Sequence, residues 1–279
     1  MPIKKNKWRK PYRQHLKTML GLTRVADIPT SFVVWAGLSQ LDGTPIMVVA
    51  SCVRDPSGNI KTGDAIQVSI MRQDMNPMDA WKQGLDGAVC PDACIHRSKP
   101  RGGDGTCYVN KARLADAWAG AVRRLQHGQP MATTEHPGVM GGRMFAGAVV
   151  RFGMEGDPSA VPLHVWQAMA KHAKRWMGYT ASWRTLDPAW AELFMASCST
   201  PADALRARSK GWRVFAASAS PELDAGFQDA GLRMCLAESN ALTCVTCGGC
   251  DGTAKGAKRP GWYLSLHGAV GAAKRRASS

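Results

Sequence analysis

Seven of the nine cysteines in this 279-residue chain fall into two groups whose spacing suits metal ligation. Thiols separated by two or three residues in a tight turn can aim their sulfurs at one point, but they are poorly placed to bond to each other. The groups therefore predict metal or iron–sulfur centres. The first group is Cys90, Cys94 and Cys107, and the second is Cys235, Cys244, Cys247 and Cys250.

The second group offers four thiolates. Its core is C-x2-C-x2-C over residues 244–250, where Gly248 and Gly249 permit a tight loop, and Cys235 can return as the fourth ligand. Four thiolates suit a structural zinc ion or a [4Fe–4S] cluster, and the spacing alone favours neither.

The first group offers three thiolates. A cluster that binds substrate needs such a set, because one iron must stay free for the ligand. The alternative is a zinc site completed by His96, two residues beyond Cys94.

A turn after a buried strand is the third candidate site. Residues 150–158 read V-R-F-G-M-E-G-D-P. Gly153 and Gly156 would let a ligand approach the backbone, and Glu155 or Asp157 could grip an ammonium or ribose hydroxyl. The alternative is a structural turn in which Asp157 caps the next helix.

The net charge of +15 is concentrated at the two ends of the chain. Eight basic residues precede the first acid, Asp27, and six follow the last acid, Asp251. Basic arms attract phosphate backbones, and Trp8 and Tyr12 could stack on bases. The alternative is a solvated tail. The predicted nucleic-acid contacts are Lys4, Lys5, Lys7, Trp8, Arg9, Lys10 and Arg13.

The elements that must position these residues alternate between strands and helices. A hairpin is expected at 31–38 and 45–53, turning near Asp42-Gly43, and a strand at 65–71. Helices are expected at 111–125, 159–177, 187–192, 201–210 and 221–230. Further strands are expected at 144–152, 178–183, 193–198, 212–217 and 262–266. This pattern predicts an α/β fold with a full or partial (β/α) barrel-like parallel sheet, an N-terminal β-hairpin and cysteine-rich loops.

The domain organisation follows from the same pattern. Residues 1–25 are a basic arm, residues 26–268 a single α/β metal-binding domain with cysteine loops at 84–109 and 233–252, and residues 269–279 a basic tail. Polar residues cluster at predicted strand ends, where αβ folds collect their active sites. These strand-end residues are Glu155, Asp157, Trp183, Arg184, Ser197, Cys198, Ser218 and His267.

The C-P-x-x-C…C-Y loop, the G-D-P turn and the T-C-x-x-C-x-x-C-x-G segment together resemble radical-SAM-type proteins. They are most similar to a family of phage- and plasmid-borne cysteine-rich proteins, over roughly residues 90–268. The resemblance implies that the first cysteine group holds a [4Fe–4S] cluster that binds S-adenosylmethionine and that the second holds an auxiliary cluster. It places the methionine-contacting turn at Gly153, Glu155, Gly156, Asp157 and Pro158. Radical-SAM triads are usually C-x3-C-x2-C, whereas twelve residues separate Cys94 and Cys107 here.

The expected function is an iron–sulfur protein of a mobile genetic element that acts on or with nucleic acid. The sequence leaves open whether it is an enzyme. The alternatives are a zinc-stabilised DNA-binding protein of plasmid or phage replication, and an interaction protein whose metals only hold loops. The absence of a long apolar run or secretory leader predicts a cytoplasmic protein with no membrane partner.

Overall fold

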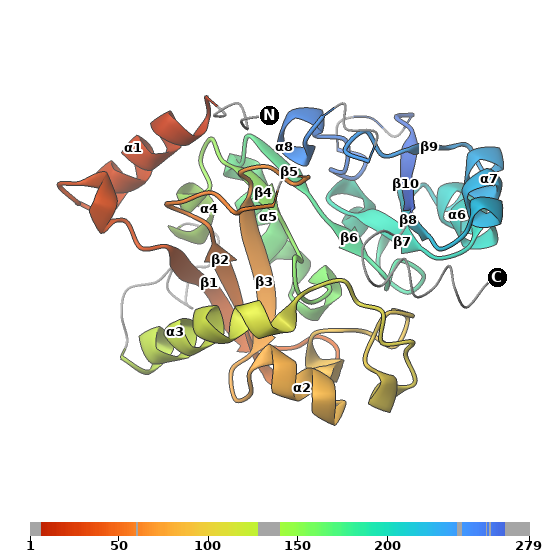
Figure 1. Ribbon diagram of the computed structural model, residues 1–279. Helices are drawn as coiled ribbons and strands as arrows, with labels where there is room; N and C mark the ends of the chain where they lie inside the picture. Colours follow the sequence, from red (N-terminus) through yellow and green to blue (C-terminus); the bar gives the residue numbers. More distant parts are fainter. Residues whose placement is uncertain are drawn as a thin grey trace.

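The computed structural model describes residues 7–59, 61–127, 140–238, 242–254, 256 and 258–265. Its strands form two five-stranded sheets in a mixed α/β arrangement (Figure 1). Within these described ranges no helix is both long and apolar enough to span a bilayer.

The first sheet has the order β1-β2-β3-β4-β5. Its β1–β2 and β2–β3 pairs are antiparallel, and its β3–β4 and β4–β5 pairs are parallel. The β1–β2 turn is stabilised by Asp42, whose carboxylate accepts from the Thr44 N–H at 2.9 Å. The strands are β1 (Ser31–Leu38), β2 (Pro45–Ser51), β3 (Ile66–Arg72), β4 (Val149–Arg151) and β5 (Arg175–Met177).

The second sheet is parallel throughout and has the order β6-β7-β8-β10-β9. The helices between its strands begin at well-formed caps: Thr200 and Ser220 accept from backbone N–H groups, and a proline follows each. The strands are β6 (Tyr179–Thr180), β7 (Met195–Cys198), β8 (Val214–Ser218), β9 (Leu232–Met234) and β10 (Gly261–Ser265).

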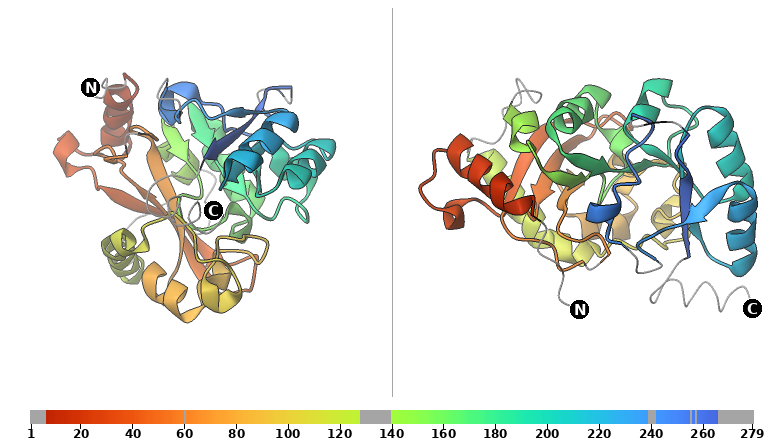
Figure 2. Two further views of the ribbon diagram at one scale, coloured as in Figure 1. Left: turned by 45° about the vertical axis from the view of Figure 1, so that its right-hand side comes forward. Right: turned by 90° about the horizontal axis from the view of Figure 1, so that it is seen from above.

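Helices cover both sheets. α3 packs against β1, and α6 and α7 pack on the outer side of the second sheet (Figure 2). The helices are α1 (Arg9–Met19), α2 (Pro77–Gln83), α3 (Ala115–Gln126), α4 (Met140–Met144), α5 (Leu163–His172), α6 (Pro201–Ser209), α7 (Pro221–Asp229) and α8 (Cys244–Cys247).

Both faces of the first sheet are buried, because alternate residues of its strands enter different cores. In β2, Met47 and Val49 join the smaller cluster with Ala121 of α3, whereas Ile46 and Val48 join the main core. The continuous apolar runs of these strands follow from this double burial.

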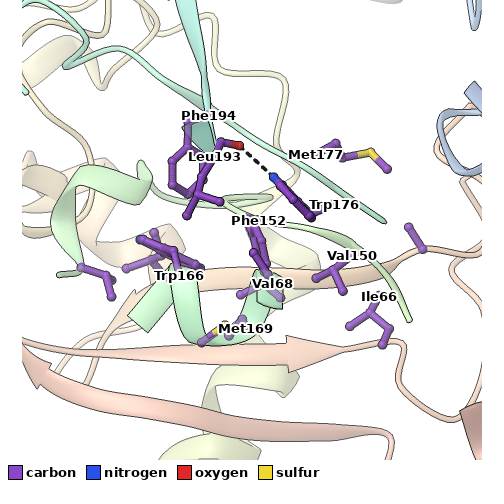
Figure 3. Close-up of a cluster of buried hydrophobic side chains, with 14 of the residues drawn as sticks. Ile66, Val68, Val150, Phe152, Trp166, Met169, Trp176, Met177, Leu193 and Phe194 are labelled. Atoms are coloured by element: carbon purple, nitrogen blue, oxygen red, sulfur yellow. Dashed lines mark hydrogen bonds between the residues drawn. The ribbon is translucent and has the colours of Figure 1, made fainter. Parts of the chain in front are cut away.

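The two sheets meet at Gly178, which separates β5 from β6 and whose carbonyl accepts from the Met195 N–H at 3.1 Å. A Cβ at this position would lie 2.8 Å from ring atoms of Phe194, so the close approach requires glycine. Beneath it, Phe194 packs with Phe152 and Trp166, and the Trp176 indole donates to the Leu193 carbonyl at 3.0 Å (Figure 3).

One sequence prediction, the helix at 159–177, is wrong in part, and two others are met only in part. No strand ladder of the described residues closes the sheets into a barrel. The helix expected at 159–177 ends at His172, because the chain turns extended at Ala173 and residues 175–177 pair with β4. The basic arm expected at 1–25 is partly folded: α1 contributes Tyr12 and Leu16 to the main core.

Candidate metal and ligand site

The turn after β4 is tied by backbone hydrogen bonds to β3 and to the first cysteine loop. The Met154 N–H donates to the Val68 carbonyl at 2.8 Å, and the Ile70 N–H donates to the Glu155 carbonyl at 2.8 Å. The Asp157 N–H donates to the carbonyl of Val89, the residue before Cys90, at 2.7 Å. The fold thus brings together the turn and the start of the cysteine loop, although Val89 and Asp157 are 68 residues apart in the sequence.

The first cysteine loop is organised by its own arginines. Arg101 donates to the Cys90 carbonyl at 2.7 Å, and Arg97 donates to the Cys94 carbonyl at 2.9 Å. The Cys90 thiol is hydrogen-bonded to Cys94, which lowers the pKa of Cys94 and raises that of Cys90. Cys94 is therefore the first of the two to ionise.

A buried ion pair joins Cys107 to the turn. The Lys111 ammonium lies 3.2 Å from the Cys107 sulfur and 3.5 Å from the Glu155 carboxylate, with both charged side chains almost fully buried. It also lies 3.9 Å from the centre of the Trp81 ring. Burial lowers the pKa of Lys111, but Glu155 and Cys107 outweigh this effect and the net shift is upward. Burial raises the pKa of Cys107, against the opposing effect of Lys111.

Asp157 has the structural role that the sequence left open beside a ligand role. Its carboxylate accepts from the Ser159 N–H at 2.9 Å, the Thr180 hydroxyl at 2.7 Å and the Ala181 N–H at 2.7 Å. It caps the short 3₁₀ helix Pro158–Ala160 and fastens this turn to β6. Burial raises the pKa of Asp157 despite these donors. The carboxylates of both Glu155 and Asp157 are thus engaged by protein groups.

The second cysteine group is built on the short helix α8. Thr243 and Thr246 form a reciprocal capping box at its start, and Gly248 ends it in the left-handed conformation with φ 59°. Cys235 follows β9, and its N–H donates to the Tyr263 carbonyl of β10 at 2.7 Å. The Cys250 carbonyl accepts from the Gly178 N–H at 3.1 Å, at the junction of the two sheets.

All four cysteines of the second group line one cavity of about 260 Å³. The wall opposite them is the inner face of the second sheet. In β8, Val214 and Ala216 are buried towards the helices, whereas Phe215 and Ala217 are half-buried and line the cavity. Such a volume far exceeds that of a single ion or water molecule, which needs roughly 10–15 Å³ by the same measure.

Arg151, the last residue of β4, brings a positive charge to this cavity. Burial lowers its pKa, but the ionisable groups around it, Tyr108, Tyr179 and Cys244, make the net shift upward. Burial raises the pKa of Cys244 to about 11, and Arg151 opposes this effect. Burial also raises the pKa of Cys250, although Tyr179 is hydrogen-bonded to it.

Tyr108 connects the two cysteine groups. It follows Cys107 in the chain, lines the cavity of the second group, and its hydroxyl accepts a hydrogen bond from Arg151. Sequence reasoning did not find Arg151, Tyr179 or Lys111. The only available signal for Arg151 was its place in a strand, immediately before the glycine turn.

His96, the possible fourth ligand of the first group, is engaged by neighbouring side chains of its own loop. His96 lies 2.7 Å from the Thr106 hydroxyl and 3.8 Å from the Asp104 carboxylate. Over the described ranges, no three or more His, Cys, Asp or Glu side chains are grouped so as to hold a metal ion.

The predicted nucleic-acid contacts divide into buried and exposed residues. The Trp8 indole donates to Asp64 at 3.2 Å, and Arg9 donates to the carbonyls of Cys52 and Val53 at 2.8 and 3.0 Å. Trp8, Arg9 and the stacking candidate Tyr12 are buried, so they are not free to bind bases as expected. Lys7 and Lys10 are exposed, Arg13 is half-buried, and Lys4 and Lys5 lie outside the described residues.

The remaining strand-end residues that the structure describes lie outside the lining of this cavity. Arg184 pairs with Asp203 at 2.7 Å and lies 4.4 Å from the centre of the Trp183 ring. Cys198 is buried, which raises its pKa to about 12. Ser197 is half-buried, the Ser218 hydroxyl donates to the Ser220 carbonyl at 2.9 Å, and His267 lies outside the described residues.

No family model, curated protein or solved structure matches this chain.

Proposed function

We propose that the chain is an iron–sulfur protein related in chemistry to radical-SAM enzymes. Cys90, Cys94 and Cys107 would hold a [4Fe–4S] cluster with one open position. Cys235 and the three cysteines of residues 244–250 would hold a second, closed cluster. A reducing, cytoplasmic compartment, which keeps these thiols free, is part of this proposal.

The observation that carries the proposal is the meeting of three separate motifs. The glycine turn is hydrogen-bonded to the residue before Cys90, and Cys107 is linked to the same turn through Lys111. Tyr108 then extends from this loop to the cavity of the second cysteine group. This arrangement supports a common site on the inner side of a barrel-like, incomplete wall of strands.

The cysteines supply the type of donor that such a group requires, and their sulfurs would have to draw together to bind it, because no three ligand side chains are so grouped within the described ranges. Thiolates are the ligands of iron–sulfur clusters, and a lysine that donates to a ligating sulfur is a recurrent way of tuning such ligands. A cluster on the first group would, when bound, supply the electron for reductive cleavage of S-adenosylmethionine. Lys111 would donate to the Cys107 sulfur, and Asp157 would fix the turn through its three hydrogen bonds.

Metal analysis of anaerobically purified protein tests the proposal. We expect a brown protein with about eight irons per chain, as two four-iron clusters require. Changing Cys90 and Cys94 together to serine should remove about half of the iron, and so should changing Cys244 and Cys247 together. Cys198→Ala, which removes a buried thiol outside both groups, should leave the iron content unchanged. A colourless protein with stoichiometric zinc would refute the proposal in favour of the zinc-stabilised alternative.

We propose nucleic acid as the partner, on the basis of the net charge of +15 and the exposed lysines of the N-terminal segment. Binding should weaken steeply with salt. Changing Lys7 and Lys10 to alanine tests this part better than deleting residues 1–25, because deletion would also remove Tyr12 and Leu16 from the core. Binding that ignores both salt and these lysines would refute it.

A further inference from the structure

Arg151 is a buried cation whose described contacts are with neutral groups and thiols. Its side chain lines the cavity of the second cysteine group and is only 9% exposed. Its hydrogen-bond partner is the Tyr108 hydroxyl, and the Tyr108 ring lies 5.7 Å from the guanidinium. No Asp or Glu within the described ranges forms an ion pair with it. Burying a charge is costly unless an opposite charge accompanies it.

The rest of the cavity is suited to a planar, apolar group. Tyr179 and Phe215 stack with ring centres 4.1 Å apart, and both line the cavity together with Trp262. The Trp262 indole N–H donates a hydrogen bond to the Gly249 carbonyl at 3.0 Å. Thr62 adds a buried hydroxyl that has no hydrogen-bond partner among the described residues. A mostly apolar wall with a few directed polar groups is typical of a small-molecule site.

Tyr108 is placed to cover this cavity. It lines the cavity, yet it is 65% exposed. Its hydroxyl accepts a hydrogen bond from the Arg151 guanidinium. An exposed aromatic side chain that makes one hydrogen bond can rotate away from the cavity at a small cost in free energy. A stronger acceptor could then take its place on Arg151.

We infer that this cavity binds a small molecule with a planar apolar body and a carboxylate or phosphate group, whose oxygens replace the Tyr108 hydroxyl on Arg151. The guanidinium fork matches both anions, and the aromatic wall contacts the apolar body. The inference names a substrate class for the proposed enzyme and so takes its catalytic meaning from the proposed function. Binding itself requires only the part of the cavity beside Arg151 and the aromatic residues, whereas a cluster on the second group would lie against its cysteines.

Titration calorimetry on the full-length, anaerobically purified chain tests the inference with defined probes. Phenyl phosphate and benzoate distinguish the two anions, inorganic phosphate lacks the ring, and benzamide lacks the charge. We expect phenyl phosphate, benzoate or both to bind more tightly than inorganic phosphate and benzamide. Arg151→Met should weaken binding about 10- to 100-fold, as expected for hydrogen bonds to a charged group.

Three further variants sharpen the test. Tyr108→Phe, which keeps the ring but frees Arg151, should tighten binding about two- to tenfold. Arg151→Lys, which keeps the charge but loses the paired guanidinium donors, should bind the anionic probes more weakly than the unaltered chain. This variant replaces Arg151→Met in the test if Arg151→Met does not fold. Arg184→Met is the control: Arg184 pairs with Asp203 at 2.7 Å, and neither residue belongs to the cavity lining. It should leave binding unchanged.

The inference is overturned if neither anionic probe binds, if benzamide binds as well as benzoate, or if Arg151 variants bind as tightly as the unaltered chain. Iron analysis of the same samples separates this inference from the proposed function. A protein that contains iron but binds neither anion would refute this inference alone. A protein that contains zinc and binds the anions would refute only the iron–sulfur assignment.

Discussion

The two cysteine groups differ in how the chain holds them. Cys107 of the first group is joined to the glycine turn by the buried Lys111–Glu155 pair, and the turn is held by backbone hydrogen bonds to β3. Within the second group, α8 begins at a capping box formed by residues only three apart. The position of the first group therefore depends on contacts between distant segments, whereas the start of α8 is fixed locally.

The two groups also differ in the charges around them. Glu155 adds to the rise in the pKa of Cys107, and Lys111 opposes it. Near the second group, the cation Arg151 opposes the rise in the pKa of Cys244. Anionic thiolates are stabilised by cations and disfavoured by carboxylates. Cys107 therefore relies on a single lysine, and its surroundings should be sensitive to the loss of that lysine.

The largest effect is expected from Lys111→Met. This change leaves Glu155 buried without its partner, which should lower the free energy of unfolding by about 3–5 kcal/mol. Burial already raises the pKa of Glu155, and removing Lys111 raises it further. A carboxyl group whose pKa is higher in the folded state gains stability as the pH falls, so the defect should be smaller at about pH 5 than at about pH 8. Urea unfolding at both values measures this.

The control for Lys111→Met is Lys61→Met. Lys61 pairs with Glu238 at 3.0 Å beside the second group, but its side chain is 39% exposed. That change should cost less than about 1 kcal/mol. Adding Glu155→Gln to Lys111→Met should recover part of the stability. Equal losses at the two lysines would contradict the contrast between the groups.

A smaller effect is expected from Gly156→Ala, compared with Gly43→Ala. Both glycines have left-handed backbone, with φ 79° and 77°, so each substitution carries a cost of about 1 kcal/mol. At Gly156 the added Cβ would also lie 2.8 Å from Ile70 Cβ and 3.0 Å from its carbonyl oxygen, whereas nothing lies within 4 Å at Gly43. Overpacking adds about 2 kcal/mol at Gly156.

Thermal or urea unfolding measures the stability lost by each variant. The difference between the two losses is the contribution of the close packing at the turn. In the proposed iron–sulfur protein, Gly156→Ala should also reduce iron in the first group while the second keeps its own. Similar stability in the two variants would mean that the turn can move away from β3.

Local sequence patterns were enough to place most elements of the second sheet. The helices expected at 201–210 and 221–230 are α6 and α7, within one residue at their ends, because proline and a capping side chain mark each start. The strand expected at 262–266 is β10, shifted by one residue. The helix expected at 159–177 was wrong in its last residues, because pairing with β4 is a non-local contact that helical periodicity does not record.

The sequence predicted the cysteines and the glycine turn of the candidate site but not the residues that surround them. Cysteine spacing identified both groups, but the residues that give them different surroundings, Lys111 and Arg151, come from other elements. The burial of Trp8 was missed for the same reason: its partner, Asp64, lies 56 residues away. The local sequence around a charged or aromatic residue in a basic segment does not reveal whether that residue faces solvent or packs against a distant strand.

The smallest effect is expected from Thr243→Ala in the capping box of α8. Its hydroxyl accepts from the Thr246 N–H at 3.3 Å, and its loss should cost about 1 kcal/mol. Thr200→Ala is the matched control, because Thr200 caps α6 in the same way, accepting from the Asp203 N–H at 3.1 Å, away from both cysteine groups. The two variants should lose similar stability, measured by urea unfolding. In the proposed iron–sulfur protein, only Thr243→Ala should release iron faster to a chelator, because Cys244 and Cys247 lie on the helix that it caps. Equal iron release from both variants would show that the local cap adds nothing to the distant contacts that also hold the second group.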